Sequence, residues 1–144
     1  MNDSLRWSRL SVMNRCQIAL IVALSTLPMA ALAQEGGEAT YKAVCAACHT
    51  AGVVNAPKLG DAKKWGPLIR EGQAVLTAHG YVGIRGMPAK GGKPDLSIED
   101  FADAVVYMVN NSGGKWSSPG SKTLAAIRAE IDKREKAIAA KARK

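Results

Sequence analysis

CAACHTAGVVNAPKLG, residues 45–60, is the stretch from which the fold can be inferred, because two cysteines three positions apart lead directly into a histidine. Such a pair serves three chemistries in proteins: a redox disulfide, half of a zinc site, or the attachment point of a covalent haem. A redox pair follows a strand inside a βαβ unit, and no β-strand alternation is visible in this chain. Zinc needs four ligands, and His79 is the only histidine besides His49.

The first 33 residues have the pattern of a secretory signal peptide. Three arginines precede the uncharged apolar run CQIALIVALSTL, and an A-x-A pattern ends at Ala33. The run is too short to cross a bilayer, so we expect cleavage after Ala33 and a periplasmic protein rather than an uncleaved anchor. Cys16 leaves with this leader, and the mature chain then keeps only Cys45 and Cys48.

The mature chain is predicted to be all-α, with no internal repeat. The expected helices are residues 38–49, 61–72, 73–80, 98–111 and 123–144. We expect Pro67 to break or restart the second helix and Gly80 to end the third. Ser97 should cap the fourth in a capping box that has Asp100 in place of glutamate, and Ser121 should cap the last.

The spacing, the leader and the helical background together favour covalent haem. Two thiols three positions apart on a helical turn reach the two vinyl groups, and His49 then presents its imidazole to the iron. Attachment of this kind takes place outside the cytoplasm, in agreement with the leader. Aromatic residues are only 5% of the chain, so the core would be thin without a porphyrin inside it. The carbonyl of Pro57 is suited to accept from the His49 ring, although a loop proline needs no such role.

The second axial ligand decides what the haem does, and Met87 is the strongest candidate. It lies in RGMPAKGG, within the glycine- and proline-rich loop 81–96, where Gly86 permits close backbone approach and Pro88 stiffens the chain. An irregular loop is a poor place for a core methionine. Met108 falls on the apolar stripe of a predicted helix and is assigned to packing, and His79 has the position of a surface histidine.

Residues 36–112 resemble a class I c-type cytochrome, and specifically the bacterial cytochrome c-five type. The resemblance covers about half of the chain, and its motifs are specific. They are CAACH, the following APKLGD, the tryptophan of DAKKW, the GMPAKGG around Met87, and YMVNN at the end of a helix.

The resemblance implies a small cytochrome c fold wrapped around one covalent haem. In that fold the first and last core helices cross near Gly37 and Tyr41 against Tyr107, with the haem between them and the Met87 loop. Two features depart from the family: the cysteine pair that members often carry near the methionine loop is absent, and the tail beyond Gly113 has no recognisable counterpart. The expected organisation is a signal peptide (1–33), a cytochrome c domain (34–114), and a linker with a basic C-terminal helix (115–144).

Ligation by His49 and Met87 blocks both faces of the iron, which leaves outer-sphere transfer of single electrons. We therefore expect a periplasmic electron carrier rather than an enzyme. The alternative is a haem-binding electron-transfer subunit of a larger periplasmic oxidoreductase complex, docked through residues 121–144. A third interpretation, a ligand-binding or peroxidatic haem, requires Met87 to be absent from the iron.

Charge is the remaining signal about partners. The chain carries a formal net charge of +8, and residues 34–144 keep 17 basic and 11 acidic residues, a net charge of +6. Such a charge favours redox proteins with acidic docking surfaces, and export argues against nucleic acid. Lys58, Lys90 and Lys93 should rim the haem crevice, either as steering charges or simply as solubilising ones. The basic helix has too sparse an apolar face for strong membrane insertion, so a solvated helix is favoured over a membrane anchor.

Overall fold

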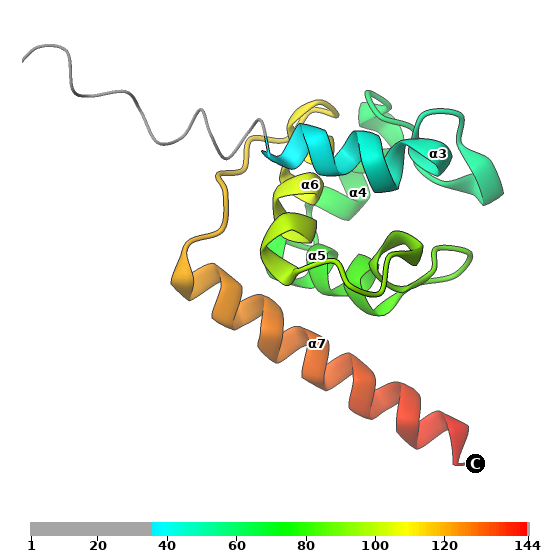
Figure 1. The fold of residues 1–144 in the computed structure, drawn as a ribbon, viewed down its shortest axis with the longest axis vertical. Coiled ribbons are helices and arrows are strands. Elements are labelled where there is room, and N and C mark those ends of the chain that lie inside the picture. Colours follow the sequence, from blue (N-terminus) through cyan, green and yellow to red (C-terminus); the bar gives the residue numbers. More distant parts are fainter. Residues whose placement is uncertain (1–35, 144) are drawn as a thin grey trace, which may run out of the picture.

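The computed structural model describes residues 36–143, and the predicted leader lies outside them (Figure 1). The described residues form helices and loops without a β-strand, apart from an isolated bridge between Ile84 and Met87. The all-α prediction is therefore confirmed. Between residues 36 and 143 no helix combines the length and the apolar character that a membrane crossing requires.

The first described helix runs from residue 36 to His49 and changes its winding on the way. Residues 36–40 are α-helical, Tyr41–Cys45 form a π-helical turn, and α3 continues over Ala46–His49. Wider π-helical turns of this kind are frequent at functional sites, and this one leads directly into the Cys-x-x-Cys-His motif.

This helix crosses α6 (Ile98–Asn110), as the resemblance implied (Figure 1). At the crossing point Gly37 faces the backbone of Asp103 so closely that a Cβ atom there would lie 2.5 Å from the Asp103 carbonyl oxygen. One helical turn later the rings of Tyr41 and Tyr107 pack with centroids 5.3 Å apart. A glycine therefore sets the distance between the two helices, and two tyrosines fill the space beside it.

Helix α6 begins where the sequence predicts and carries the centre of the core. The Ser97 hydroxyl oxygen accepts from the Asp100 backbone N–H at 3.0 Å, and its own proton is donated to the Asp100 carboxylate at 2.7 Å. Aspartate is one methylene shorter than glutamate, and here its carboxylate bonds the capping hydroxyl rather than the Ser97 amide. Phe101, Val105 and Met108 are all buried on one stripe, as predicted.

Helices α4 (Ala62–Ile69) and α5 (Gln73–Val82) differ from the prediction at two positions. Asp61 caps α4, but Pro67 lies inside the helix without breaking it. The preceding residue, Gly66, has no Cβ to collide with the proline ring, and α4 ends two residues after Pro67. Gly80 does not end α5 but lies buried within it, and the helix stops only before Gly83, whose φ is +93°.

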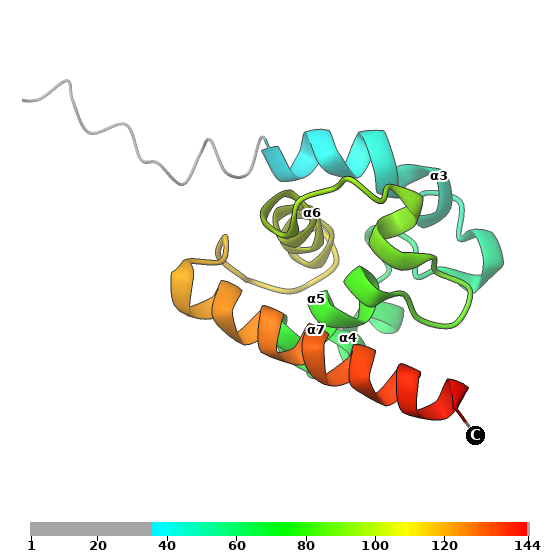
Figure 2. The same cartoon turned by 60° about the horizontal axis from the view of Figure 1, so that its bottom comes forward.

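The C-terminal tail forms a long helix, α7 (Ser121–Ala142), that packs along α5 (Figure 2). The expected cap was wrong, since Ser121 is the first helical residue and Gly120 occupies the capping position without a side-chain hydrogen bond. Ile127 and Ile131 are buried against α5 and α6, whereas Ile138 is 50% exposed near the far end. The sparse apolar stripe is thus sufficient to dock the first half of the helix.

Candidate functional site

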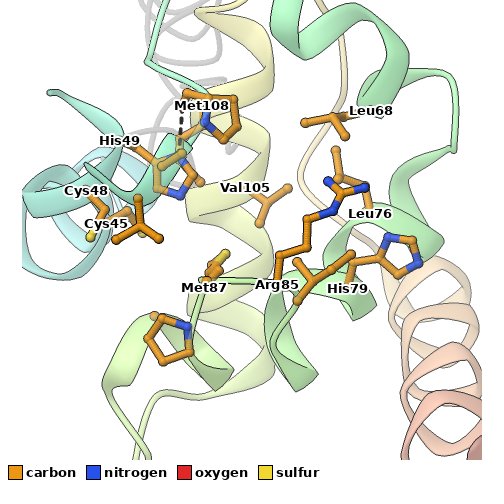
Figure 3. Close-up of a pocket in the computed structure, with 18 of the residues that line it drawn as sticks. Cys45, Cys48, His49, Leu68, Leu76, His79, Arg85, Met87, Val105 and Met108 are labelled. Atoms are coloured by element: carbon orange, nitrogen blue, oxygen red, sulfur yellow. Dashed lines mark hydrogen bonds between the residues drawn. The ribbon is translucent and has the colours of Figure 1, made fainter. Parts of the chain in front are cut away.

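A cavity of about 500 Å³ opens between α3, α4, α5, α6 and the Met87 loop (Figure 3). Its volume falls within the range of small-molecule and cofactor sites. The lining is mostly apolar and includes side chains from helices far apart in the sequence. The apolar walls are formed by Val44, Trp65, Leu68, Leu76, Ile84, Phe101, Val105 and Met108.

His49 enters this cavity from the end of α3 and is only 6% exposed. Its Nδ1 lies 2.8 Å from the carbonyl oxygen of Pro57, which is the hydrogen bond that the sequence suggested. A carbonyl can only accept, so Nδ1 carries the proton and the lone pair of the ring belongs to Nε2. The orientation of His49 therefore suits it to bind a metal through Nε2.

The loop that follows His49 is held by hydrogen bonds from three directions. The Leu59 N–H donates to the His49 carbonyl at 2.8 Å, and the indole N–H of Trp65 donates to the Lys58 carbonyl at 2.8 Å. The Gly60 N–H donates to the hydroxyl oxygen of Ser112, just beyond α6, at 2.9 Å. The acceptor for the His49 ring is thus part of a rigid loop.

Cys45 and Cys48 form no disulfide with each other and line one edge of the cavity (Figure 3). Cys45 is 4% exposed, and this burial, with a smaller contribution from Cys48, raises the pKa of its thiol to about 11. A thiol that stays protonated at neutral pH is a poor disulfide-exchange nucleophile. Within residues 36–143, no group of three or more His, Cys, Asp or Glu side chains is arranged to hold a metal ion.

Met87 reaches the cavity from a tight loop after α5. Its N–H donates to the Ile84 carbonyl at 2.9 Å, and the Ile84 N–H donates back to the Met87 carbonyl at 3.1 Å. Figure 3 shows the Met87 side chain pointing into the space beneath the His49 ring. At Gly86 a Cβ atom would lie 2.5 Å from the Val54 side chain, so the glycine permits the close approach that the sequence suggested.

The two alternative ligands are occupied in other ways. Met108 lies in the buried stripe of α6, although it also lines the cavity. The Nδ1 atom of His79 lies 2.9 Å from the carboxylate atom Oε2 of Glu71. Burial lowers the pKa of His79, the charge of Arg134 lowers it further, and Glu71 opposes both. His79 is thus partly buried rather than a surface residue, and its Nδ1 is engaged with a carboxylate.

The comparisons with known proteins agree with this geometry. The family model described as cytochrome c oxidase, cbb3-type, subunit III matches residues 32–108, just over half of the chain. The chain belongs to this family of c-type cytochromes. Cytochrome c-555 of Chlorobaculum thiosulfatiphilum is 49% identical to this cytochrome over 80 residues, which cover 53% of this chain and 93% of that protein. Cytochrome c5 of Ectopseudomonas mendocina is 38% identical over 66 residues, covering 44% and 76%.

A solved structure points to the same class. It is described as the crystal structure of an electron transfer complex of nitrite reductase with cytochrome c. One of its chains matches this cytochrome with a TM-score of 0.52 and 38% identity, over 54% of this chain and 94% of that one. The class I assignment, the small cytochrome c fold and a covalent haem c therefore hold for this chain, and its relatives are monohaem cytochromes c involved in electron transfer.

The site has the donor set that such a haem requires. An imidazole and a thioether approach the cavity from different elements, two thiols lie at one edge, and the remaining walls are apolar. The bound haem supplies one-electron chemistry at its iron, and the protein supplies ligands, orientation and a dry surrounding.

Two of the three lysines that were expected to rim the haem crevice, Lys90 and Lys93, contact other groups, and none of the three is among the residues that line the cavity. The Lys90 ammonium donates to the Pro94 carbonyl at 2.8 Å and lies 4.8 Å from the centre of the Tyr81 ring. Lys93 pairs with Asp95 at 3.6 Å. Lys58 is exposed and makes no ion pair with any described residue.

One residue that sequence reasoning missed is Gly80. A Cβ atom at this position would lie 2.9 Å from the Phe101 ring and 3.4 Å from the methyl group of Met87. The absent side chain therefore leaves room for both groups. A glycine costs about 1 kcal/mol relative to alanine in a helix interior, so its presence inside an apolar helical pattern was the available signal.

Proposed function

We propose that this chain is an exported, periplasmic carrier of single electrons, with a haem bound through thioethers to Cys45 and Cys48. His49 and Met87 are the two axial ligands, and the Pro57 carbonyl fixes the ring of His49. The cleaved leader ends at Ala33. The partners are redox proteins with acidic docking surfaces, and the chain performs no substrate chemistry of its own.

The observation that carries the proposal is the opposed approach of His49 and Met87 to one apolar cavity. Hydrogen bonds restrict the position of each: the His49 ring donates to the Pro57 carbonyl, and the backbones of Met87 and Ile84 bond each other. Second-shell contacts of this kind orient ligands and tune the site. Two ligands held in this way leave no open coordination position, and a thioether raises the reduction potential.

The mouth of the cavity supports contact with a partner protein. Val53 and Val54 both line the cavity and are 46% and 74% exposed. Val54 also has a φ of +50°, a conformation that β-branched residues rarely adopt. Exposed apolar side chains next to the unpaired Lys58 suit a small, short-lived interface that is steered by charge. Rates of electron transfer should fall as salt is raised.

The decisive experiment replaces Met87 by alanine in the holoprotein. We expect the covalent haem to remain, the weak far-red methionine-to-iron band of the ferric form to disappear, and the reduction potential to fall. The reduced variant should also take up carbon monoxide readily. Met108→Leu is the matched control, because it removes a second methionine of the same cavity at little cost in volume.

An unchanged ferric spectrum in Met87→Ala would show that Met87 is not the ligand. Loss of the band in Met108→Leu instead would assign the ligand to α6. Export is tested separately, by the intact mass of protein purified from the periplasm. A mature chain that begins at Gln34 supports the leader, and a retained leader contradicts it.

The alternative, a subunit of a larger complex, is favoured by one observation. The matching family model carries the name of an oxidase subunit, although that name describes other proteins. Size-exclusion chromatography of a native extract separates the two hypotheses. A free carrier elutes as a small monomer, whereas a subunit elutes with a complex.

A further inference from the structure

Helix α7 has no part in the electron-transfer site described so far, and it lies entirely beyond the residues that match the family model. It is nevertheless docked on the haem domain. Ile127 is 0% exposed and Ile131 is 7% exposed, and their buried neighbours are Ala78 of α5 and Ile98 and Ala102 of α6. Full burial of one such side chain contributes about 1.5–3 kcal/mol. The helix is thus anchored at the junction of α5 and α6.

Polar contacts hold α7 and its linker at several points. Arg128 pairs with Glu99 of α6 at 2.7 Å. In the linker, the Ser118 hydroxyl donates to Asp103 of α6 at 2.6 Å, and the Ser117 carbonyl accepts from Gln73 of α5 at 3.0 Å. Trp116 adds two backbone hydrogen bonds to a side chain of α6. Segment 115–120 is therefore fastened to the same two helices that α7 covers.

The opposite side of α5 faces Met87. Gly80, two positions after Ala78, lies where a Cβ atom would be 3.4 Å from the Met87 methyl group. Helix α5 ends at Val82, and Ile84 then forms the two hydrogen bonds that hold the Met87 backbone. One helix thus carries the α7 contact on one side and the base of the methionine loop on the other (Figure 2).

We propose that α7 is an intramolecular brace: by clamping α5 against α6 it holds the methionine loop in place and keeps the Met87 thioether opposite His49. The inference rests on the proposed ligation by Met87. Cores are closely packed and transmit displacements, so a loosened α5 shifts the loop that it carries. Without the brace, an added ligand displaces the thioether more easily.

The experiment titrates the ferric full-length holoprotein with imidazole and follows the loss of the far-red band. In the double variant Ile127→Ala/Ile131→Ala we expect the half-saturating imidazole concentration to fall at least tenfold, which corresponds to about 1.4 kcal/mol. Ile138→Ala is the matched control, because the same substitution on the same helix removes a side chain that is 50% exposed. Its half-saturating concentration should stay within about twofold of the wild type.

Two further measurements keep the test decisive. Trypsin, which cleaves at the many lysines and arginines of α7, reports whether the helix has detached in the double variant. If α7 detaches and the imidazole affinity is unchanged, the brace is refuted while the ligation by Met87 stands. If the wild type itself lacks the far-red band, the ligation fails and the brace fails with it.

Should the double variant not fold, Ile127→Val provides a milder perturbation that removes one methylene group. This change costs about 0.5–1.5 kcal/mol in a core. A half-saturating imidazole concentration roughly two- to fivefold below that of the wild type supports the brace. Reduced thermal stability with wild-type imidazole affinity contradicts it.

Discussion

Replacing Gly37 by alanine tests the helix crossing that closes the haem domain. The new Cβ atom would lie 2.5 Å from the Asp103 carbonyl oxygen and 3.4 Å from the Cβ of Tyr107. The carbonyl belongs to the backbone of α6 and cannot swing aside as a side chain does. The neighbouring Gly36 provides a matched control, since a Cβ atom there meets nothing within 4 Å.

The size of the effect follows from that distance. Ordinary contact begins near 3.4 Å, so the crossing must open by about 0.9 Å, and gaps of this size forfeit a quarter to a half of the local dispersion energy. Overpacking a core costs about 1–3 kcal/mol, and contact with rigid backbone places this site in the upper part of that range. Alanine gains up to about 1 kcal/mol of helix propensity at either position. Gly37→Ala should therefore be about 2–3 kcal/mol less stable than Gly36→Ala.

Guanidinium unfolding of the two ferric holoproteins, followed by circular dichroism and by haem absorbance, measures this difference. Thermal unfolding should show a gap of roughly 10–20 °C between the two variants. Both should retain covalent haem, because neither change touches the cysteines. Equal stabilities within about 0.5 kcal/mol would refute the close crossing at Gly37.

The remaining predictions concern α5. Gly80→Ala places a Cβ atom 2.9 Å from the Phe101 ring and against the Met87 methyl group, so we expect lower stability and a weakened far-red band, whereas unchanged values of both would contradict the contact. Burial and the nearby Arg134 hold the pKa of His79 below its usual 6.5. At pH values near and below 6.5 the unfolded chain therefore binds more protons than the folded one, so the free energy of unfolding should fall as the pH drops. His79→Gln lacks the titrating group and should not lose stability in this way. As the pH is lowered from about 8 to about 5, the denaturation midpoint of His79→Gln should therefore rise relative to that of the wild type. A difference between the two midpoints that does not change with pH would argue against the shifted pKa.

Features that depend on a few neighbouring residues can be predicted from the sequence. The CAACH motif, the cap at Ser97 and the hydrogen bond between His49 and Pro57 each involve groups that the chain brings together over a short distance. The apolar stripe of α6 can also be predicted from the helical period, because a helix that packs one face against the core carries its large apolar side chains on that face. These local rules are sufficient to predict the all-α class and a haem site.

Features that depend on distant partners could not be predicted. Gly80 looks like a helix end until Phe101 and Met87 are found beside it, because only their positions show why a side chain is excluded. The sequence suggests that Pro67 breaks the helix. It is accommodated inside α4 because Gly66 has no Cβ atom to collide with the proline ring and because the helix ends two residues later. The tail has a sparse apolar stripe around Ile127, but the cluster on α5 and α6 against which that stripe docks cannot be inferred from the tail alone.

The burial of Cys45 has a consequence for the proposed haem attachment. Its thiol is 4% exposed and packs in the same cluster as Val105 and Met108 of α6, which is synthesised long after it. The loop behind it is fastened to the end of α6, since Gly60 bonds Ser112 across 52 residues of chain. Cys45 nevertheless lines the cavity, so its side chain stays within reach of a porphyrin there when α6 is docked. Under the proposed attachment, the packed core fixes the position of the Cys45 side chain, and the haem edge must come to the sulfur rather than the sulfur to the haem.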